Sequence, residues 1–104
     1  MDERKTEVRE SEIEEWLNRE IKKLGGRPIK FTSPSASGVP DRLYVLPGGR
    51  VWFVELKAEE GAPSKLQCHW GKILTKLGCN YRLIIGMQEA MDFEKELRHG
   101  ISSS

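Results

Sequence analysis

The sequence contains little of what disulfide-rich, zinc-binding and membrane proteins need. Its 104 residues include two cysteines, Cys68 and Cys79, which fit no CxxC or zinc pattern and make no disulfide framework. No stretch approaches the roughly 20 apolar residues of a membrane span, and residues 1–5 lack the apolar core of a signal peptide. We therefore expect a cytoplasmic protein with reduced thiols and no membrane partner.

The common catalytic sets built on histidine or on a phosphate loop are also absent. The sequence shows no Ser-His-Asp set, no Gly-rich phosphate loop and no cluster of His and Cys. Of the two histidines, His99 lies in the tail and His69 is expected on the surface of a helix. Trp16, Trp52 and Trp70 are interpreted as core or interface side chains. None of these residues marks a site by itself.

A net charge near zero hides an uneven distribution of charge. Residues 1–20 hold eight acidic and four basic side chains, and residues 83–104 hold four and two. Residues 21–82 hold eleven basic and four acidic side chains, which gives this part a net charge of +7. Such a basic module is expected to bind a polyanion, although a solvated surface gives the same pattern.

The pattern of apolar residues predicts one domain of mixed α/β class. Its first three strands follow one another directly and are expected to form an antiparallel meander. A helix connects the last two strands, so these should be parallel neighbours joined by a right-handed crossover. We expect a small mixed sheet flanked by helices, with a core of about 9–98 and frayed ends at 1–5 and 100–104. Helices are predicted over about 6–24, 64–77 and 88–98, and strands over 28–32, 43–46, 51–57 and 80–86.

Two carboxylates and a lysine, Asp41, Glu55 and Lys57, lie in a predicted β-hairpin that is otherwise apolar. Carboxylates opposed across a hairpin repel each other, and a divalent cation between them removes the repulsion because hard cations take carboxylate oxygens. Lys57 shares the face of Glu55, since strand side chains repeat every two residues. The alternative is that Asp41 caps a turn after Pro40, while Glu55 and Lys57 form an ion pair.

The hairpin turn decides between these two interpretations. The link Leu46-Pro47-Gly48-Gly49-Arg50 suits a type I turn, with Pro47 at the second position and Gly49 in the left-handed conformation. This loop pairs Leu46 with Arg50, and counting back places the two carboxylates opposite each other. A two-residue loop at Gly48-Gly49 would shift the register by one and separate the carboxylates onto different faces.

Two helical residues lie where they could serve a site or merely cap a helix. Glu10 falls within the apolar stripe of the first helix, and Glu14 lies beside that stripe. A carboxylate in that position either caps the helix, where negative charge suits the dipole, or points into a site. Ser64-Lys65-Leu66-Gln67 is a capping box by sequence, so Gln67 has a structural role available. The stripe expected to be buried on this second helix comprises Leu66, Trp70, Ile73, Leu74 and Leu77.

Four motifs follow one another along the chain with compatible spacing. They are Glu10-x-x-Ile13 in a helix, Gly38-Val39-Pro40-Asp41-Arg42, Phe53-Val54-Glu55-Leu56-Lys57-Ala58 and Lys65-Leu66-Gln67. Over residues 9–86 the ordered set resembles the virus-type replication-repair nuclease (VRR-NUC) domain, a branch of the PD-(D/E)XK nuclease superfamily. The resemblance implies a restriction-endonuclease-like fold and a Mg²⁺- or Mn²⁺-dependent endodeoxyribonuclease.

The same resemblance implies roles for individual residues. Asp41 and Glu55 would hold the metal ion together with the backbone carbonyl of Leu56. Lys57 would orient or deprotonate the attacking water, and Gln67 would support the site. Glu10, as the best match to the helix glutamate of the family, would help to position the metal ion or the water.

DNA contacts are expected from the basic middle of the chain, where Lys30, Arg42, Arg50 and Lys65 are the nearest candidates. No segment resembles a base-reading element, so we expect recognition of DNA shape or of a junction. The resemblance also implies a phage or bacterial homodimer that resolves Holliday junctions, with Trp16 or Trp52 as candidate interface residues. Two alternatives remain open: a flap-type or restriction-like nuclease in a larger complex, and a non-catalytic nucleic-acid-binding module with the same fold.

Overall fold

The computed structural model describes residues 8–33 and 36–102. These form one four-stranded sheet of order β1-β2-β3-β4, antiparallel from β1 to β3 and parallel between β3 and β4, which confirms the predicted fold class. None of the described helices is long and apolar enough to cross a membrane. The elements are α1 (Glu10–Lys23), β1 (Arg27–Lys30), β2 (Arg42–Leu46), β3 (Arg50–Lys57), α2 (Lys65–Lys76), β4 (Asn80–Ile85) and α3 (Gly86–Ser102).

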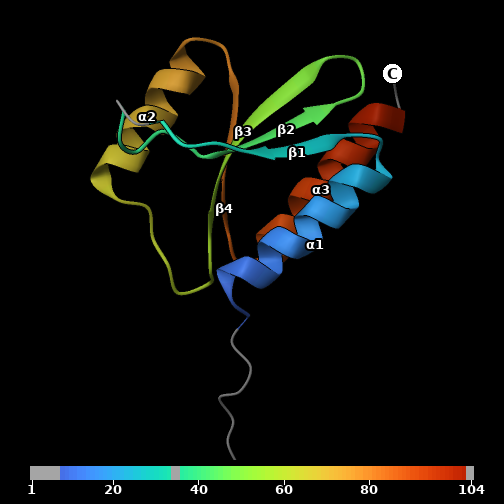
Figure 1. The fold of residues 1–104 in the computed structure, drawn as a ribbon, viewed down its shortest axis with the longest axis horizontal. Coiled ribbons are helices and arrows are strands. Elements are labelled where there is room, and N and C mark those ends of the chain that lie inside the picture. Colours follow the sequence, from blue (N-terminus) through green and yellow to red (C-terminus); the bar gives the residue numbers. More distant parts are fainter. Residues whose placement is uncertain (1–7, 34–35, 103–104) are drawn as a thin grey trace, which may run out of the picture.

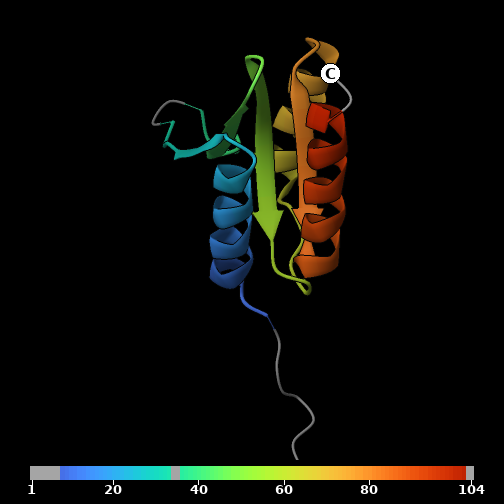
Figure 2. The ribbon, with the colours of Figure 1, turned by 90° about the vertical axis from the view of Figure 1, so that its right-hand side faces the viewer.

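The helices cover opposite faces of the sheet. α1 and α3 lie side by side on one face, and α2 lies on the other (Figure 1 and Figure 2). Neighbouring side chains of β4 show the alternation. The guanidinium carbon of Arg82 lies 5.0 Å from the ring centroids of Trp52 and of Phe93 on α3, whereas Tyr81 packs against Gly71 of α2. We refer to these two sides as the α1/α3 face and the α2 face.

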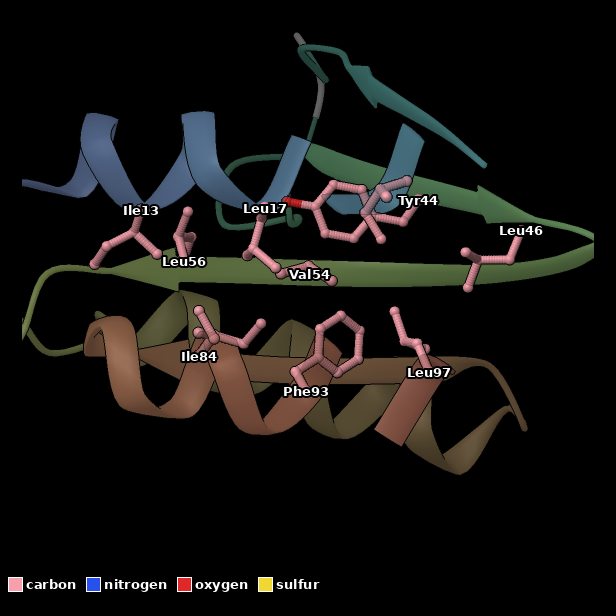
Figure 3. Close-up of a cluster of buried hydrophobic side chains, with 11 residues drawn as sticks. Ile13, Leu17, Tyr44, Leu46, Val54, Leu56, Ile84, Phe93 and Leu97 are labelled. Carbon is pink, nitrogen blue, oxygen red and sulfur yellow. The ribbon is translucent and has the colours of Figure 1, made fainter. Parts of the chain in front are cut away.

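The hydrophobic core lies on the α1/α3 face. Ile13, Leu17 and Ile21 recur at four-residue spacing on α1, and each is fully buried. Trp16 and Trp52 are partly buried against this core, which agrees with their interpretation as core side chains; a role at an interface stays a prediction. The remaining core residues come from β2, β3, β4 and α3: Tyr44, Leu46, Val54, Leu56, Ile84, Ala90, Phe93 and Leu97 (Figure 3).

The turn between β2 and β3 has the predicted register but a different type. Leu46 pairs with Arg50, as the three-residue loop requires. Gly48 and Gly49 have φ angles of 84° and 77°, and the N–H of Gly49 donates to the Leu46 carbonyl at 3.1 Å. A positive φ at the third position of the turn is typical of type II, so the predicted type I turn is wrong. The register survives because the loop length is unchanged.

Helix α2 buries a narrower stripe than the sequence predicts. Leu66 and Leu77 are 45% and 74% exposed, whereas Gly71 and Leu74 are buried. The helix approaches the sheet through Gly71, where a Cβ atom would lie 2.7 Å from the Cζ atom of Tyr81. The prediction that Leu66 and Leu77 are buried is therefore wrong, because a glycine rather than a leucine makes the closest contact.

The ends of the domain also differ from the prediction. α1 begins at Glu10, with the Glu12 side chain accepting a hydrogen bond from the backbone N–H of Arg9 at 2.8 Å. α3 continues to Ser102, so fraying from residue 100 is wrong. A Cβ atom at Gly100 would lie 3.1 Å from a guanidinium nitrogen of Arg50, and this tertiary contact outweighs the low helix propensity of glycine. Residues 1–5 and 103–104 lie outside the described residues.

Candidate active site

The register of the hairpin places Asp41 beside Glu55. Arg42 pairs with Val54, so the next step of the antiparallel ladder puts Asp41 opposite Glu55. The backbone carbonyl of Asp41 accepts a hydrogen bond from the N–H of Phe31 at 3.0 Å, which extends the pairing of β1 and β2 to this residue. The structure thus brings Asp41, Glu55 and Lys57 together on the α2 face, at the end of β3.

Glu55 is the buried carboxylate of this group. Its side chain is 8% exposed, and its Oε2 atom accepts a hydrogen bond from Gln67 Nε2 at 3.1 Å and lies 3.7 Å from Lys57 Nζ. Burial raises the pKa of Glu55; the charge of Lys57 opposes this, and the charges of Asp41 and Glu10 add to it. The carboxylate is therefore short of compensating positive charge, which a bound cation would supply.

Gln67 reaches Glu55 because the first turn of α2 is fixed by a capping box. The N–H of Gln67 donates to Ser64 Oγ at 3.1 Å, and its side-chain Oε1 accepts from the N–H of Ser64 at 2.8 Å. These bonds confirm the predicted capping box and leave the Nε2 group free to donate to Glu55. Gln67 therefore has both roles, and the amide orients the buried carboxylate.

A glycine brings the segment before Asp41 against the start of α2. Gly38 has a φ angle of 88°, and a Cβ atom there would lie 2.8 Å from Leu66 Cγ and 2.9 Å from the Leu66 carbonyl carbon. Both the positive φ and the close approach favour glycine at this position. The contact joins the segment that carries Asp41 to the helix that carries Gln67.

Arg42 occupies a different place from the one predicted. Its side chain is 7% exposed, and it donates to Asp41 Oδ1 at 3.2 Å, Glu10 Oε2 at 3.3 Å and Glu14 Oε2 at 3.2 Å. The prediction that Arg42 contacts DNA does not agree with this burial, since strand alternation turns the side chain toward α1. The sequence already indicates this, because Arg42 directly follows Asp41 and adjacent residues of a strand point to opposite faces of the sheet.

The two glutamates of α1 are both bound to Arg42, but they differ in their relation to Glu55. The Glu10 side chain is 44% exposed. Its negative charge raises the pKa of Glu55, with a smaller effect than burial, Lys57, Asp41 and Arg42. Glu14 is 21% exposed and also lies 3.8 Å from Lys30. Among the α1 carboxylates, Glu10 is thus electrostatically linked to the candidate site.

Comparison with known proteins identifies relatives of this chain. No model of a known protein family matches the chain. A protein of Acyrthosiphon pisum secondary endosymbiont phage 1, described as "Putative nuclease p44", is 48% identical over 64 residues, which make up 60% of this chain and 69% of that protein. A solved structure described as "VRR_NUC domain" has a TM-score of 0.76 and 26% identity, covering 83% of this chain and 94% of that one. The chain belongs to the VRR-NUC family.

The basic residues predicted to contact DNA are spread over this VRR-NUC domain. Lys65 is exposed at the first position of α2, two residues before Gln67. Lys30 is 62% exposed on β1, where it pairs in register with Arg42. Arg50 lies at the opposite end of β3, five residues or roughly 17 Å from Glu55, beside Gly100 of α3. The structure therefore brings Lys65 near the VRR-NUC site and leaves Arg50 away from it.

The donors available for a metal ion in this VRR-NUC domain are hard oxygens. Within residues 8–33 and 36–102, no three His, Cys, Asp or Glu side chains are grouped as a metal site. The predicted set instead has two carboxylates and the backbone carbonyl of Leu56. In the described part of the chain the hydrogen bonds of Glu55 and Asp41 use Oε2 and Oδ1, which leaves Oε1 and Oδ2 as donors. Such a donor set fits Mg²⁺ or Mn²⁺.

Proposed function

We propose that this chain is a metal-dependent, structure-selective DNA endonuclease that hydrolyses phosphodiester bonds. The observation that carries the proposal is the buried carboxylate of Glu55, bound by Gln67 and Lys57 and opposed by Asp41. Membership of the VRR-NUC family and the similarity to a phage protein described as a nuclease support the reaction class. The phage relative also supports action in the cytoplasm of a bacterial host.

The metal ion of this reaction would be held by Asp41, Glu55 and the carbonyl of Leu56. Glu10 would act on the same ion through a water molecule, because its carboxylate is bound to Arg42 beside Asp41. A bound Mg²⁺ or Mn²⁺ ion supplies charge stabilisation for the phosphoryl oxygens and acidifies a water molecule. The deficit of positive charge around Glu55 is the physical reason to place the cation there.

Two side chains prepare the attack on the phosphodiester. Lys57, 22% exposed and on the same face as Glu55, presents its ammonium group to solvent, where it orients the attacking water and adds positive charge beside the phosphate. Gln67 fixes the rotamer of Glu55 through its amide, so the carboxylate does not have to reorganise when substrate binds. Both groups belong to rigid elements of the fold.

The proposed substrate is branched DNA, and the proposed assembly is a homodimer. One chain carries one such site, whereas a four-way junction has two symmetric strands to cut, so paired nicks need two copies. Leu66, Leu77 and Ile29 expose 45%, 74% and 45% of their surface and are candidates for an isologous interface. Sedimentation at micromolar concentration, with and without junction DNA, tests this assembly. A monomer that nicks flaps and leaves junctions intact would favour a flap-type nuclease instead.

The test of the reaction is the Lys57→Ala variant on a panel of four-way junction, flap, splayed-arm and duplex DNA. We expect Mg²⁺- or Mn²⁺-dependent cleavage by the wild type to fall by a factor on the order of 10² in the variant, with folding and DNA affinity retained. Lys95→Ala, an exposed position on α3, is the matched control and should cut normally. Wild-type rates in Lys57→Ala would refute the mechanism, and binding without cleavage by the wild type would favour a non-catalytic module.

A further inference from the structure

A groove between α2 and β4 remains outside the roles assigned so far. Its volume is about 440 Å³, and its walls are almost wholly apolar. α2 supplies Cys68, Gly71 and the stems of Lys72 and Lys76, and β4 supplies Tyr81 and Leu83. The lining positions 68, 71, 72, 75 and 76 follow helical spacing, so the groove runs along one side of α2.

The groove begins beside the candidate active site. Leu83 pairs in register with Glu55, and Tyr81 lies two residues earlier on the same face of β4. This offset places the backbones of Tyr81 and Glu55 about 8 Å apart. Burial raises the pKa of Tyr81, and the charge of Glu55 acts in the same direction, as expected for two side chains of one face. A DNA strand bound at Glu55 would therefore reach the groove with its neighbouring nucleotide.

The shape of the groove depends on a missing side chain. A Cβ atom at Gly71 would lie 2.7 Å from Tyr81 Cζ and 2.9 Å from its hydroxyl oxygen. Any larger residue would push the aromatic ring out of its place. Gly71 thus lets α2 approach β4 while the phenol ring remains at the wall of the groove.

The charged residues that line the groove are lysines. α2 carries Lys65, Lys72 and Lys76 and contains no aspartate or glutamate. Lys72 and Lys76 are exposed, so their stems form the apolar wall and their ammonium groups stand at its rim. An apolar and aromatic wall with a cationic rim is complementary to one kind of ligand, a flat apolar ring joined to phosphates.

We propose that this groove binds an unpaired nucleotide of the DNA substrate, with its base against Tyr81 and Leu83 and its phosphates at Lys72 and Lys76. The proposal rests on the proposed nuclease function and deepens it. A base enters the groove only when it has left its stack, so the favoured substrate carries an unpaired nucleotide next to the bond that is cut. Fully paired duplex DNA offers no such base, which makes the groove a selectivity element.

The experiment measures DNA binding in EDTA, where no cleavage occurs. The probes are a flapped duplex with 2-aminopurine at the unpaired nucleotide beside the branch and a fully paired duplex of equal length. Tyr81→Ala should weaken binding of the flapped DNA about tenfold and that of the duplex less than twofold, whereas Tyr81→Phe should behave as wild type. The 2-aminopurine emission should be quenched on binding to the wild type and unchanged with Tyr81→Ala.

A double variant tests the rim without touching the core. Lys72→Ala with Lys76→Ala should lower the slope of log affinity against log salt by about two. Lys22→Ala with Lys95→Ala, at exposed positions on α1 and α3, should leave the slope unchanged. Equal losses for flapped and paired DNA with Tyr81→Ala would overturn the proposal, as would a change of oligomeric state in the Lys72/Lys76 variant with DNA binding retained. If the nuclease function is wrong, the wild type fails to cut with Mg²⁺ or Mn²⁺ while this binding preference persists.

Discussion

The two faces of the sheet differ in how they are packed. The α1/α3 face buries an apolar core formed by both helices and by β2, β3 and β4. In this core the ring centroid of Phe93 lies 6.5 Å from that of Tyr44 and 5.2 Å from that of Trp52. The α2 face holds a single helix that touches the sheet through Gly71 and leaves a groove beside it. The first face supplies stability, and the second face has room for a substrate.

The same division holds for the charged residues. Arg42, on the α1/α3 face, is surrounded by three carboxylates that its guanidinium satisfies. Glu55, on the α2 face, has the ammonium group of Lys57 at 3.7 Å and remains short of positive charge. A cluster of ions whose charges are paired stabilises a fold, whereas a carboxylate whose charge is incompletely paired marks a candidate functional site. Five measurements can break or sharpen this contrast.

The largest effect is expected in the core. Phe93→Ala removes a side chain that is 1% exposed and should lower the free energy of unfolding by about 3–5 kcal/mol. Leu77→Ala directly after α2, where the side chain is 74% exposed, should change it by less than about 0.5 kcal/mol. Urea denaturation of both variants tests the contrast. Similar losses in the two would show that the α2 face also carries stability.

The second effect concerns the metal ion at the α2 face. Mg²⁺ or Mn²⁺ at a hundredfold excess over its dissociation constant should stabilise the wild type by about 2.7 kcal/mol, because it binds only the folded state. Asp41→Asn and Glu55→Gln remove the proposed donors and should abolish this gain in a thermal melt. Glu12→Gln, at an exposed position of α1, should keep it. A metal-induced shift that survives in both donor variants would disprove the assignment.

The third effect separates the role of Arg42 from DNA binding. Arg42→Gln removes the guanidinium that pairs with three carboxylates and should lower stability by about 2 kcal/mol. This is less than the loss for a fully buried pair, since the side chains of Asp41, Glu10 and Glu14 are 46%, 44% and 21% exposed to solvent. Arg19→Gln, on the exposed side of α1, should be neutral. Weakened DNA binding with unchanged stability would restore the original prediction for Arg42.

Most of the fold could be predicted from local patterns. The hairpin register follows from the length of the loop between Leu46 and Arg50, and the parallel pairing of β3 and β4 follows from the helix between them. The turn type could not be predicted, because a Pro-Gly-Gly sequence is compatible with either sign of φ at Gly48. The extension of α3 past Gly100 depends on Arg50, which is fifty residues away in the sequence.

The candidate site was predictable to the extent that it lies within one hairpin. Strand alternation places Glu55 and Lys57 on one face, and the register adds Asp41. The bond from Gln67 to Glu55 joins two elements whose relative position depends on packing, and in the sequence it followed from the family resemblance alone. The groove at Tyr81 was missed because a glycine, Gly71, makes the decisive contact and carries no apolar signal.

The fourth effect is a dependence on pH of opposite sign on the two faces. The folded-state pKa of Glu55 is raised, mainly by burial, so its contribution to stability is lost as pH rises through that value. For Glu14, burial is outweighed by the hydrogen bond and charge of Arg42, and the lowered pKa gives stability that is lost as pH falls. In EDTA at pH 7, Glu55→Gln should melt above the wild type and Glu14→Gln below it. The Glu55 difference should disappear as pH falls to about 4, near the ordinary pKa of glutamate, whereas the Glu14 difference should persist at that pH and shrink only below it.

The smallest effect compares two basic residues at opposite ends of the molecule. Lys65 is exposed on α2, two residues before Gln67, and Arg50 lies beside Gly100 on the α1/α3 face. Lys65→Ala should weaken binding of every DNA a few-fold and lower the salt slope by about one, as expected for the loss of one phosphate contact. Arg50→Ala should leave both quantities unchanged. If Arg50→Ala has the larger effect in a salt titration, DNA crosses the hairpin end of the sheet, and the α2 face is not the binding surface.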